Sequence, residues 1–178
     1  MSCKLTSKIT KDNCQYAVAG VKDIYLINYD PATEYTYDTD GGIETIVLPE
    51  KEKAYKIDFA DATASFSDEL AVNGNGGKYR THTVNFTISN YDYQVLNQDR
   101  ELSLGKFTAV VVDRSGRAIM LGRNNGLSAT AFNYASGAAD ADACGWTVTL
   151  AGTEIEMGRL LKDVSVITAI ADATVVTP

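Results

Sequence analysis

The sequence has few of the residues from which enzymes and metal sites are usually built. It contains one histidine, His82, and three cysteines, Cys3, Cys14 and Cys144, with no Cys-x-x-Cys pair. One histidine cannot form a His-rich zinc site or a conventional metalloprotease motif, and the cysteine spacing is not that of a metal centre. No serine lies in a Gly-x-Ser-x-Gly nucleophile elbow. We therefore predict no catalytic residue, no metal ligand and no cofactor, and we interpret the chain as a non-enzymatic protein with a structural or surface His82.

Long apolar segments are also absent. Runs such as Ala109 to Val112 are far shorter than the roughly 20 residues that a membrane helix needs. The first residues, Met1 to Leu5, lack the charged and apolar pattern of a secretory signal. We expect a soluble protein with no membrane partner that is made in the cytoplasm, where its cysteines stay reduced.

Basic residues are outnumbered by acidic ones. The chain has 16 Lys and Arg against 23 Asp and Glu, a net charge of -7. Proteins that grip DNA rely on clustered Lys and Arg to neutralise phosphates. The composition therefore argues against stable nucleic-acid binding, although it is compatible with a protein past which nucleic acid slides.

The remaining composition is that of one globular domain spanning residues 1–178. Hydrophobic content is 45% and charged content 22%, and ten tyrosines with many threonines and valines favour strands. A chain of this length can bury roughly 70% of its extended-chain surface, so it needs no disulfide or metal to fold.

The segment from Lys78 to Leu150 has the clearest pattern. Val84, Phe86 and Ile88 alternate with polar residues, which predicts a strand with one buried face. A helix should follow, capped by Asn90, with Tyr93, Leu96, Leu102 and Leu104 as its apolar positions and Gly105 at its end. Three further strands and a tight turn are predicted after it: Lys106–Val112, the turn Asp113–Gly116, Arg117–Leu121 and Gly126–Tyr134. Gly145–Leu150 is a last strand, with Trp146, Val148 and Leu150 pointing inward.

The N-terminal half also contains strand patterns. Val21–Asn28 has Tyr25 and Ile27 on one face and Ile24 and Leu26 on the other, so we expect it between two layers. Further β patterns occupy Ile43–Leu48, Ala54–Phe59 and Ala64–Val72. Residues 54–88 then form an antiparallel pair with a protruding tip at Asn73–Gly77.

Four segments lack a clear strand pattern or are ambiguous. Residues 1–20 are interpreted as an N-terminal arm, 29–53 as a long exposed loop and 135–144 as a small acidic loop. Residues 151–162 carry Met157, Leu160 and Leu161 at helical spacing and stay ambiguous. Residues 164–176 are β-branched and apolar, which predicts a final strand or, over 162–178, a C-terminal arm.

The long loop contains a pattern that resembles the start of a calcium-binding loop. Asp38-Thr-Asp40-Gly41 begins like an EF-hand, but Gly42 takes the third acidic position and Pro49 the twelfth, so this is not an EF-hand. A non-standard calcium site made from Asp30, Glu34, Asp38 and Asp40 stays open, beside the simpler interpretation of a solvated acidic loop.

The turn and strand motifs of residues 78–155 together resemble structural proteins of tailed bacteriophages, in particular crAss-like phages of Bacteroidetes. The matching residues are Leu102–Gly105, Val110–Asp113 with Gly116, Leu121-Gly122, Asn125–Leu127 and Gly145–Glu154. The resemblance is to the tail-tube and neck-ring group. It implies a mainly β (α+β) fold, an antiparallel β-sandwich or partial barrel with one flanking α-helix, extended arms and a long loop.

The same resemblance implies a function and a place of action. The chain would be a subunit of a homo-oligomeric ring in the virion, either a portal-to-tail connector or a tail tube, assembled in the bacterial cytoplasm. Its partners would be portal, neck and tail proteins, with DNA passing through during genome ejection. Arms and loops of such a subunit bind neighbours by adding strands to their sheets, and acidic residues that line the channel repel DNA phosphates.

Two sets of residues follow from this interpretation. The candidates for contacts between subunits are Tyr29, Tyr35, Tyr37, Ile43, Val47, Val164, Val166 and Ile170. The candidates for the channel surface are Asp30, Glu34, Asp38, Asp40, Asp140 and Asp142.

A carbohydrate-binding β-sandwich is the alternative. Its stacking residues would be Tyr35, Tyr37 and Trp146, because exposed aromatic rings stack on sugars. The alternation of Trp146 with Val148 and Leu150 favours a core position for Trp146, which weakens this alternative. An enzyme would need a polar pocket that the sequence does not reveal.

Overall fold

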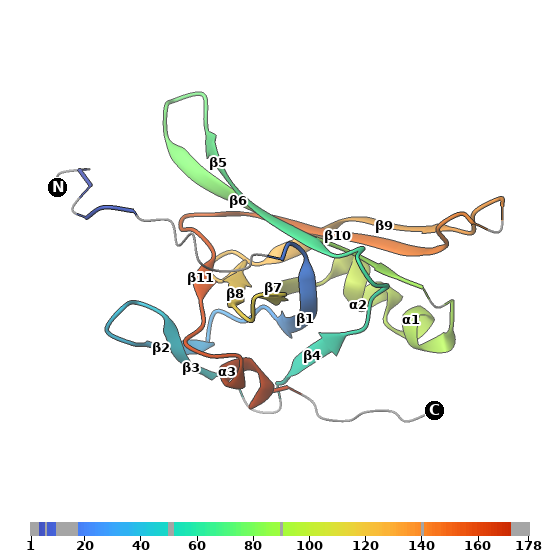
Figure 1. The fold of residues 1–178 in the computed structure, drawn as a ribbon, viewed down its shortest axis with the longest axis horizontal. Coiled ribbons are helices and arrows are strands. Elements are labelled where there is room, and N and C mark those ends of the chain that lie inside the picture. The colour runs from blue at the N-terminus through green and yellow to red at the C-terminus, as the bar shows by residue number, and fades with distance from the viewer. Residues whose placement is uncertain are drawn as a thin grey trace.

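The computed structural model describes residues 4, 5, 7–9, 18–49, 52–89, 91–139 and 141–171 (Figure 1). It is mainly β, as predicted, with 48% strand and 10% helix. The strands are β1 (Val21–Asn28), β2 (Glu34–Tyr37), β3 (Ile43–Val47), β4 (Ala54–Ile57), β5 (Ser65–Val72), β6 (Lys78–Ile88), β7 (Lys106–Asp113), β8 (Ala118–Leu121), β9 (Leu127–Ala135), β10 (Gly145–Glu154) and β11 (Arg159–Leu160). The helices are α1 (Tyr93–Asn97), α2 (Asp99–Leu104) and α3 (Ser165–Thr168). No helix of the described residues has the length and apolar composition to cross a membrane.

A nine-stranded antiparallel sheet organises the chain. One part of it has the order β4-β1-β7-β8-β11 and the other the order β9-β10-β6-β5. The two parts join where Lys106 and Phe107 at the start of β7 pair with Ser128 and Leu127 at the start of β9. Beyond this corner the parts diverge and enclose one apolar core.

The main core lies between the two parts of the sheet. Ile24 and Leu26 of β1 enter it from one side, and Phe86 of β6 with Val148 and Leu150 of β10 enter it from the other. Tyr25 and Ile27, which alternate with them along β1, point into a second core cluster. The prediction that β1 lies between two layers is therefore confirmed.

The second cluster corrects two predictions. Residues 29–53 are not a long loop, because β2 and β3 within them pair as a separate two-stranded sheet and Ile43 and Ile46 are buried. Residues 164–176 do not begin as a strand, since α3 forms there and buries Ile167 in the same cluster. In both segments the apolar residues cover the outer face of β1 and β7 instead of reaching away from the chain.

The predicted helix after β6 is two short helices. Asp92 caps α1, its side chain accepting from the backbone N–H groups of Gln94 and Val95, and Gln98 separates α1 from α2. The buried or core-facing positions are Val95 and Leu102. The prediction is confirmed for Leu102 and wrong for Tyr93, Leu96 and Leu104, which are 82%, 47% and 78% exposed. The predicted cap, Asn90, lies outside the described residues.

Gly105 ends α2 as predicted. The position favours glycine because other atoms of the chain lie too close to leave room for a side chain. A Cβ atom there would lie 2.3 Å from the carbonyl oxygen of Glu101 and 2.8 Å from the ring of Phe107.

The β7–β8 hairpin is also confirmed. Asp113 accepts a hydrogen bond from the Arg117 N–H at 2.8 Å, and Gly116 has a φ of 83°.

Two further strand predictions need correction. β4 pairs with β1 and not with β5, so only β5 and β6 form the predicted antiparallel pair. Their hairpin projects from the body of the protein, as expected (Figure 1). The ambiguous segment after Leu150 continues as β10 to Glu154 and then as β11, with no helix. Most of the predicted arm 1–20 and residues 172–178 lie outside the described residues.

Candidate functional site

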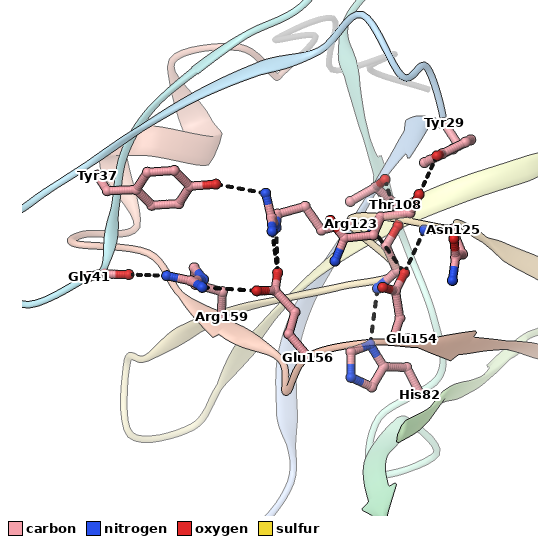
Figure 2. Close-up of polar contacts among 12 residues, drawn as sticks. Tyr29, Tyr37, Gly41, His82, Thr108, Arg123, Asn125, Glu154, Glu156 and Arg159 are labelled. Carbon is pink, nitrogen blue, oxygen red and sulfur yellow. Dashed lines mark hydrogen bonds and ion pairs between the residues drawn. The ribbon is translucent and has the colours of Figure 1, made fainter. Parts of the chain in front are cut away.

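An ion-pair cluster joins the β2–β3 hairpin to the loop after β8 and the end of β10. Glu156 lies between two arginines (Figure 2). Its Oε1 accepts from Arg123 Nε at 2.6 Å, and its Oε2 accepts from Arg159 Nη2 at 2.9 Å. Burial acts to raise the pKa of Glu156, but the bonds from the two arginines outweigh it and lower the pKa below its ordinary value. Glu156 is therefore held as a carboxylate.

Both arginines also contact the hairpin. Arg123 Nη1 donates to the Tyr37 hydroxyl at 2.6 Å, and Arg159 Nη1 donates to the Gly41 carbonyl at 2.9 Å. The Arg123 guanidinium lies 5.4 Å from the ring centre of Tyr35 and 5.8 Å from that of Tyr37, within cation–π range. Burial raises the pKa of Tyr35 to about 12 despite the charge of Arg123, so Tyr35 stays protonated.

A buried carboxylate, Glu154, organises the turn between β8 and β9. It is 1% exposed, and its Oε1 accepts from the backbone N–H groups of Asn124 and Asn125 at 3.1 and 2.8 Å. The Tyr29 hydroxyl donates to the Asn124 carbonyl on the same turn (Figure 2). Oε2 of Glu154 has no hydrogen-bond partner among the described residues. The carboxylate therefore fixes the backbone of a turn.

His82 is buried beside this turn. Its Nδ1 accepts from the Gly122 N–H at 3.2 Å, which places the ring proton on Nε2. Nε2 lies 3.3 Å from Asp68 Oδ1, close but not aligned as a hydrogen bond. Asp68 Oδ1 also accepts from Arg80 Nε at 2.5 Å, and Asp68 Oδ2 accepts from the Gly158 N–H at 2.9 Å. Burial acts to raise the pKa of Asp68, but these bonds lower it.

These polar groups are used to connect segments of the chain. The charged atoms of Asp68, Arg123, Glu156 and Arg159 all bind other residues of the chain. His82 is 2% exposed, and one of its nitrogens is used by a backbone N–H. The geometry is that of cross-links between hairpins.

The edges of the sheet are a different kind of feature. β5 pairs with β6 in an unbroken register from Ser65 to Val72 and has no strand on its other side among the described residues. β9 pairs with β7 only at Leu127 and Ser128, so past Ser128 its one neighbouring strand is β10. Among the described residues, the four strands β9-β10-β6-β5 therefore have no further strand beside β5 or beside β9 past Ser128, where α2 lies against β9.

β5 carries only part of the protection that is usual for such an edge. Natural edge strands carry lysine, proline or a bulge, which prevent pairing with another chain. β5 has none of these three, although Asp68 and Glu69 give it two charges, and its Leu70 and Val72 are 57% and 60% exposed. Both side chains lie on the projecting β5–β6 hairpin.

No family model matches the chain, and no curated protein matches it.

Several predicted contact residues lie inside the chain. Ile43 is 0% exposed, so its prediction as a contact between subunits is wrong. Val164, Val166 and Ile170 pack on the second core cluster around α3. They are partly buried by their own chain, and their role in contacts between subunits stays a prediction.

The other predicted contact residues are at the surface or next to it. Val47 is 54% exposed and Tyr37 is 42% exposed. Tyr29 and Tyr35 are half-buried, Tyr29 against Asn124 and Tyr35 against Arg123. These four stay predictions, since no partner chain is present.

The acidic candidates mostly serve turns. Asp30 accepts from the Ala32 N–H, and Asp38 accepts from the N–H groups of Asp40 and Gly42. Asp142 accepts from the N–H groups of Ala139 and Ala138, which lower its pKa. Glu34 and Asp40 are exposed, and Asp140 lies outside the described residues.

The open calcium hypothesis gains no support from these positions. Within the described ranges no three His, Cys, Asp or Glu side chains are close enough to hold a metal ion.

Trp146 belongs to an aromatic cluster. Its ring stacks on Tyr91 at 5.3 Å and on Phe132 at 4.8 Å between centroids, and Tyr134 lies 5.2 Å away. Tyr35 and Tyr37 contact arginines. The three rings proposed for sugar stacking therefore have part of their surface occupied by the chain itself.

The sequence interpretation missed Arg123, Glu154, Glu156 and Arg159. A signal existed for Glu154, because it continues the inward phase of Val148 and Leu150 along β10. A glutamate at an inward strand position predicts a buried, bonded carboxylate. For the two arginines and Glu156 no local pattern exists, since they come together only in the folded chain.

Proposed function

We propose that the protein is a non-enzymatic structural subunit of a tailed-phage virion that assembles into a ring around the DNA channel. The observation that carries the proposal is the sheet β9-β10-β6-β5, whose outer strands β5 and, past Ser128, β9 have no further strand partner among the described residues. An open edge is a row of unpaired N–H and C=O groups onto which another strand can add.

The two edges belong to different strands on opposite sides of one sheet. Contact between the β5 edge of one copy and the distal β9 edge of the next is head-to-tail, and such contacts close into a ring when the rotation between copies allows it. Pairing of β5 with β5 would instead stop at a dimer. A ring built in this way has a continuous β-sheet around its centre, as in a barrel, which leaves no exposed edge.

The phage assignment rests on the sequence resemblance together with the fold class. A mainly β chain with short flanking helices fits the sandwich or partial barrel of the tail-tube and neck-ring group. The proposed location is the neck or tail of the virion. The virion is assembled in the bacterial cytoplasm. Portal, neck and tail proteins are the proposed partners, and crAss-like phages of Bacteroidetes the proposed source.

The test begins with the native mass of the purified chain, from light scattering on a column, and negative-stain images of the same fractions. Two variants block one edge each: Leu70→Lys with Val72→Lys on β5, and Asn133→Lys with Ala135→Lys on β9. All four side chains are exposed, so the fold should survive. Tyr55→Lys on β4, at a side chain that is 45% exposed, is the matched control.

We expect rings from the wild type and from Tyr55→Lys, and monomers from each edge variant alone. An equimolar mixture of the two edge variants should give dimers, because each retains the edge that the other lacks. The proposal is wrong if the wild type stays a monomer and also fails to bind phage portal or neck proteins in a pull-down. If the β5 variant fails to assemble and the β9 variant still assembles, the result would indicate a symmetric dimer instead of a ring.

A further inference from the structure

The outward face of the sheet β9-β10-β6-β5 has an unusual composition. Side chains alternate along these strands between the core and this face, and the strand register places threonine at its centre: Thr81, Thr83, Thr87, Thr147, Thr149 and Thr153. The other outward positions hold serine, asparagine, alanine and Tyr79, and Glu69 carries the one formal charge. We name this surface the hydroxyl face.

The hydroxyl face is open in the isolated chain. None of its side chains is buried, and in Figure 1 the rest of the described chain lies on the opposite, core side of this sheet. Its side chains bind one another, as in the 2.8 Å hydrogen bond from the Thr149 hydroxyl to Asn85 Oδ1. An exposed sheet face ordinarily carries many Lys and Glu side chains, and the chain as a whole is 22% charged. The hydroxyl face is therefore less charged than the chain as a whole.

The charge of a protein surface determines how strongly it attracts or repels DNA. Affinity for a duplex comes largely from Lys and Arg that neutralise phosphates and release counterions. The hydroxyl face offers neither residue, so it provides no such attraction. The acidic residues predicted for the channel do not lie on the hydroxyl face. Asp30, Glu34 and Asp38 lie on or beside the β2–β3 hairpin, and Asp142 lies in the loop after β9.

We infer that the hydroxyl face lines the hole of the assembled ring and that double-stranded DNA passes over it. This inference rests on the proposed ring, because only joining β5 to β9 places the hydroxyl faces of successive copies side by side. Contact with the duplex then runs through hydroxyl groups and water, without strong attraction or repulsion. Passage through the ring is consequently insensitive to salt.

Thiol accessibility tests which way this face points. Cys3, Cys14 and Cys144 are replaced by serine, and a single cysteine is introduced as Thr147→Cys on the hydroxyl face or as Ser115→Cys at the β7–β8 turn. Both positions are exposed in the isolated chain. Assembled rings are treated with a small thiol reagent, and separately with a maleimide on a polyethylene glycol chain too large for the hole.

We expect Thr147→Cys in rings to react with the small reagent and to lose reaction with the large one, while Ser115→Cys reacts with both. Reaction of Thr147→Cys with both reagents would place the face outside the ring, and reaction with neither would place it in a contact between copies. Either result overturns this inference and leaves the ring proposal standing. A chain that neither assembles nor binds portal or neck proteins overturns both.

A lysine variant tests the DNA contact. Wild-type rings should retain no duplex DNA at low salt. Thr83→Lys rings should retain it, with an affinity that falls steeply as salt rises, and Ser115→Lys rings should behave as the wild type. Equal retention by the two lysine variants would refute a lining role for the hydroxyl face.

Discussion

Replacement of Glu156 with glutamine tests whether the ion-pair cluster holds the β2–β3 hairpin to the body of the protein. Glu156 receives bonds from Arg123 and Arg159, and each arginine also binds the hairpin. A hydrogen bond to a charged group contributes about 1.5–3 kcal/mol when shielded, but the Glu156 side chain is 24% exposed and partly screened by solvent. Glutamine keeps the shape and one acceptor oxygen. We expect the free energy of opening the hairpin to fall by about 2 kcal/mol.

Native-state hydrogen exchange of the β2 and β3 amides measures this opening. A loss of about 2 kcal/mol accelerates their exchange by about thirtyfold. The matched control is Glu44→Gln on the same hairpin, which removes an exposed ion pair with Lys162. Exposed pairs contribute at most about 1 kcal/mol, so this control should change the exchange by less than about fivefold.

The effect of Glu156→Gln should also depend on pH. The pKa of Glu156 is lower than its ordinary 4.5 in the folded chain. Such a carboxylate stabilises the fold fully above its unfolded pKa, and the contribution is lost as the pH falls through the folded pKa. The difference between wild type and variant should therefore be complete above about pH 5 and shrink in more acid solution. Equal exchange rates at neutral pH, or a difference that does not change with pH, would refute the reasoning.

Substitutions at three other positions test the core and the turns by urea unfolding. Glu154→Ala leaves two turn N–H groups without their acceptor and should lower the free energy of unfolding by about 2–4 kcal/mol. Glu154→Gln keeps an acceptor oxygen and should lower it by about 1 kcal/mol. Equal losses from the two variants would contradict the bonding role of Glu154. Phe86→Ala, at a 1% exposed core position, should cost about 3–5 kcal/mol, and a loss below about 1 kcal/mol would show that the core is not where we place it. Burial acts to raise the pKa of Asp113, but bonds from Arg117 lower it below 3.8. The difference in unfolding free energy between wild type and Asp113→Asn should therefore be full at neutral pH and shrink as the pH falls below about 4. A difference that does not change with pH would argue against the ion pair.

The strands that the sequence identified best are those whose side chains alternate. Val84 and Phe86 on β6, and Val148 and Leu150 on β10, are buried as their period-two spacing predicts. β1 was interpreted correctly for the same reason, because apolar residues on both of its faces require two apolar neighbours. The Asp113–Gly116 turn followed from local chemistry, since an aspartate that bonds its own backbone and a glycine with positive φ suffice to define it.

Other predictions failed where the deciding contacts are remote in sequence. Ile43 belongs to a segment rich in acidic residues and tyrosines, which predicts an exposed loop, but it lies beside Leu161 in a core that the C-terminal segment completes. The helix phase failed at Tyr93 and Leu96 because short helices take their orientation from the surface they pack on. The predicted acidic channel surface stays a prediction, although carboxylates such as Asp38 and Asp142 also bond backbone N–H groups in their own turns.

The sequence by itself determined that this chain is mainly β, which faces of β1, β6 and β10 are apolar, and where the β7–β8 hairpin turns. These properties depend on residues a few positions apart, where alternation and turn chemistry act. Only the tertiary structure decided that β5 and the distal part of β9 have no further strand beside them among the described residues, that Glu156 joins Arg123 to Arg159, and that the threonines of β6 and β10 share one face. Strand order and register bring together residues far apart in the chain, and no local pattern encodes that pairing.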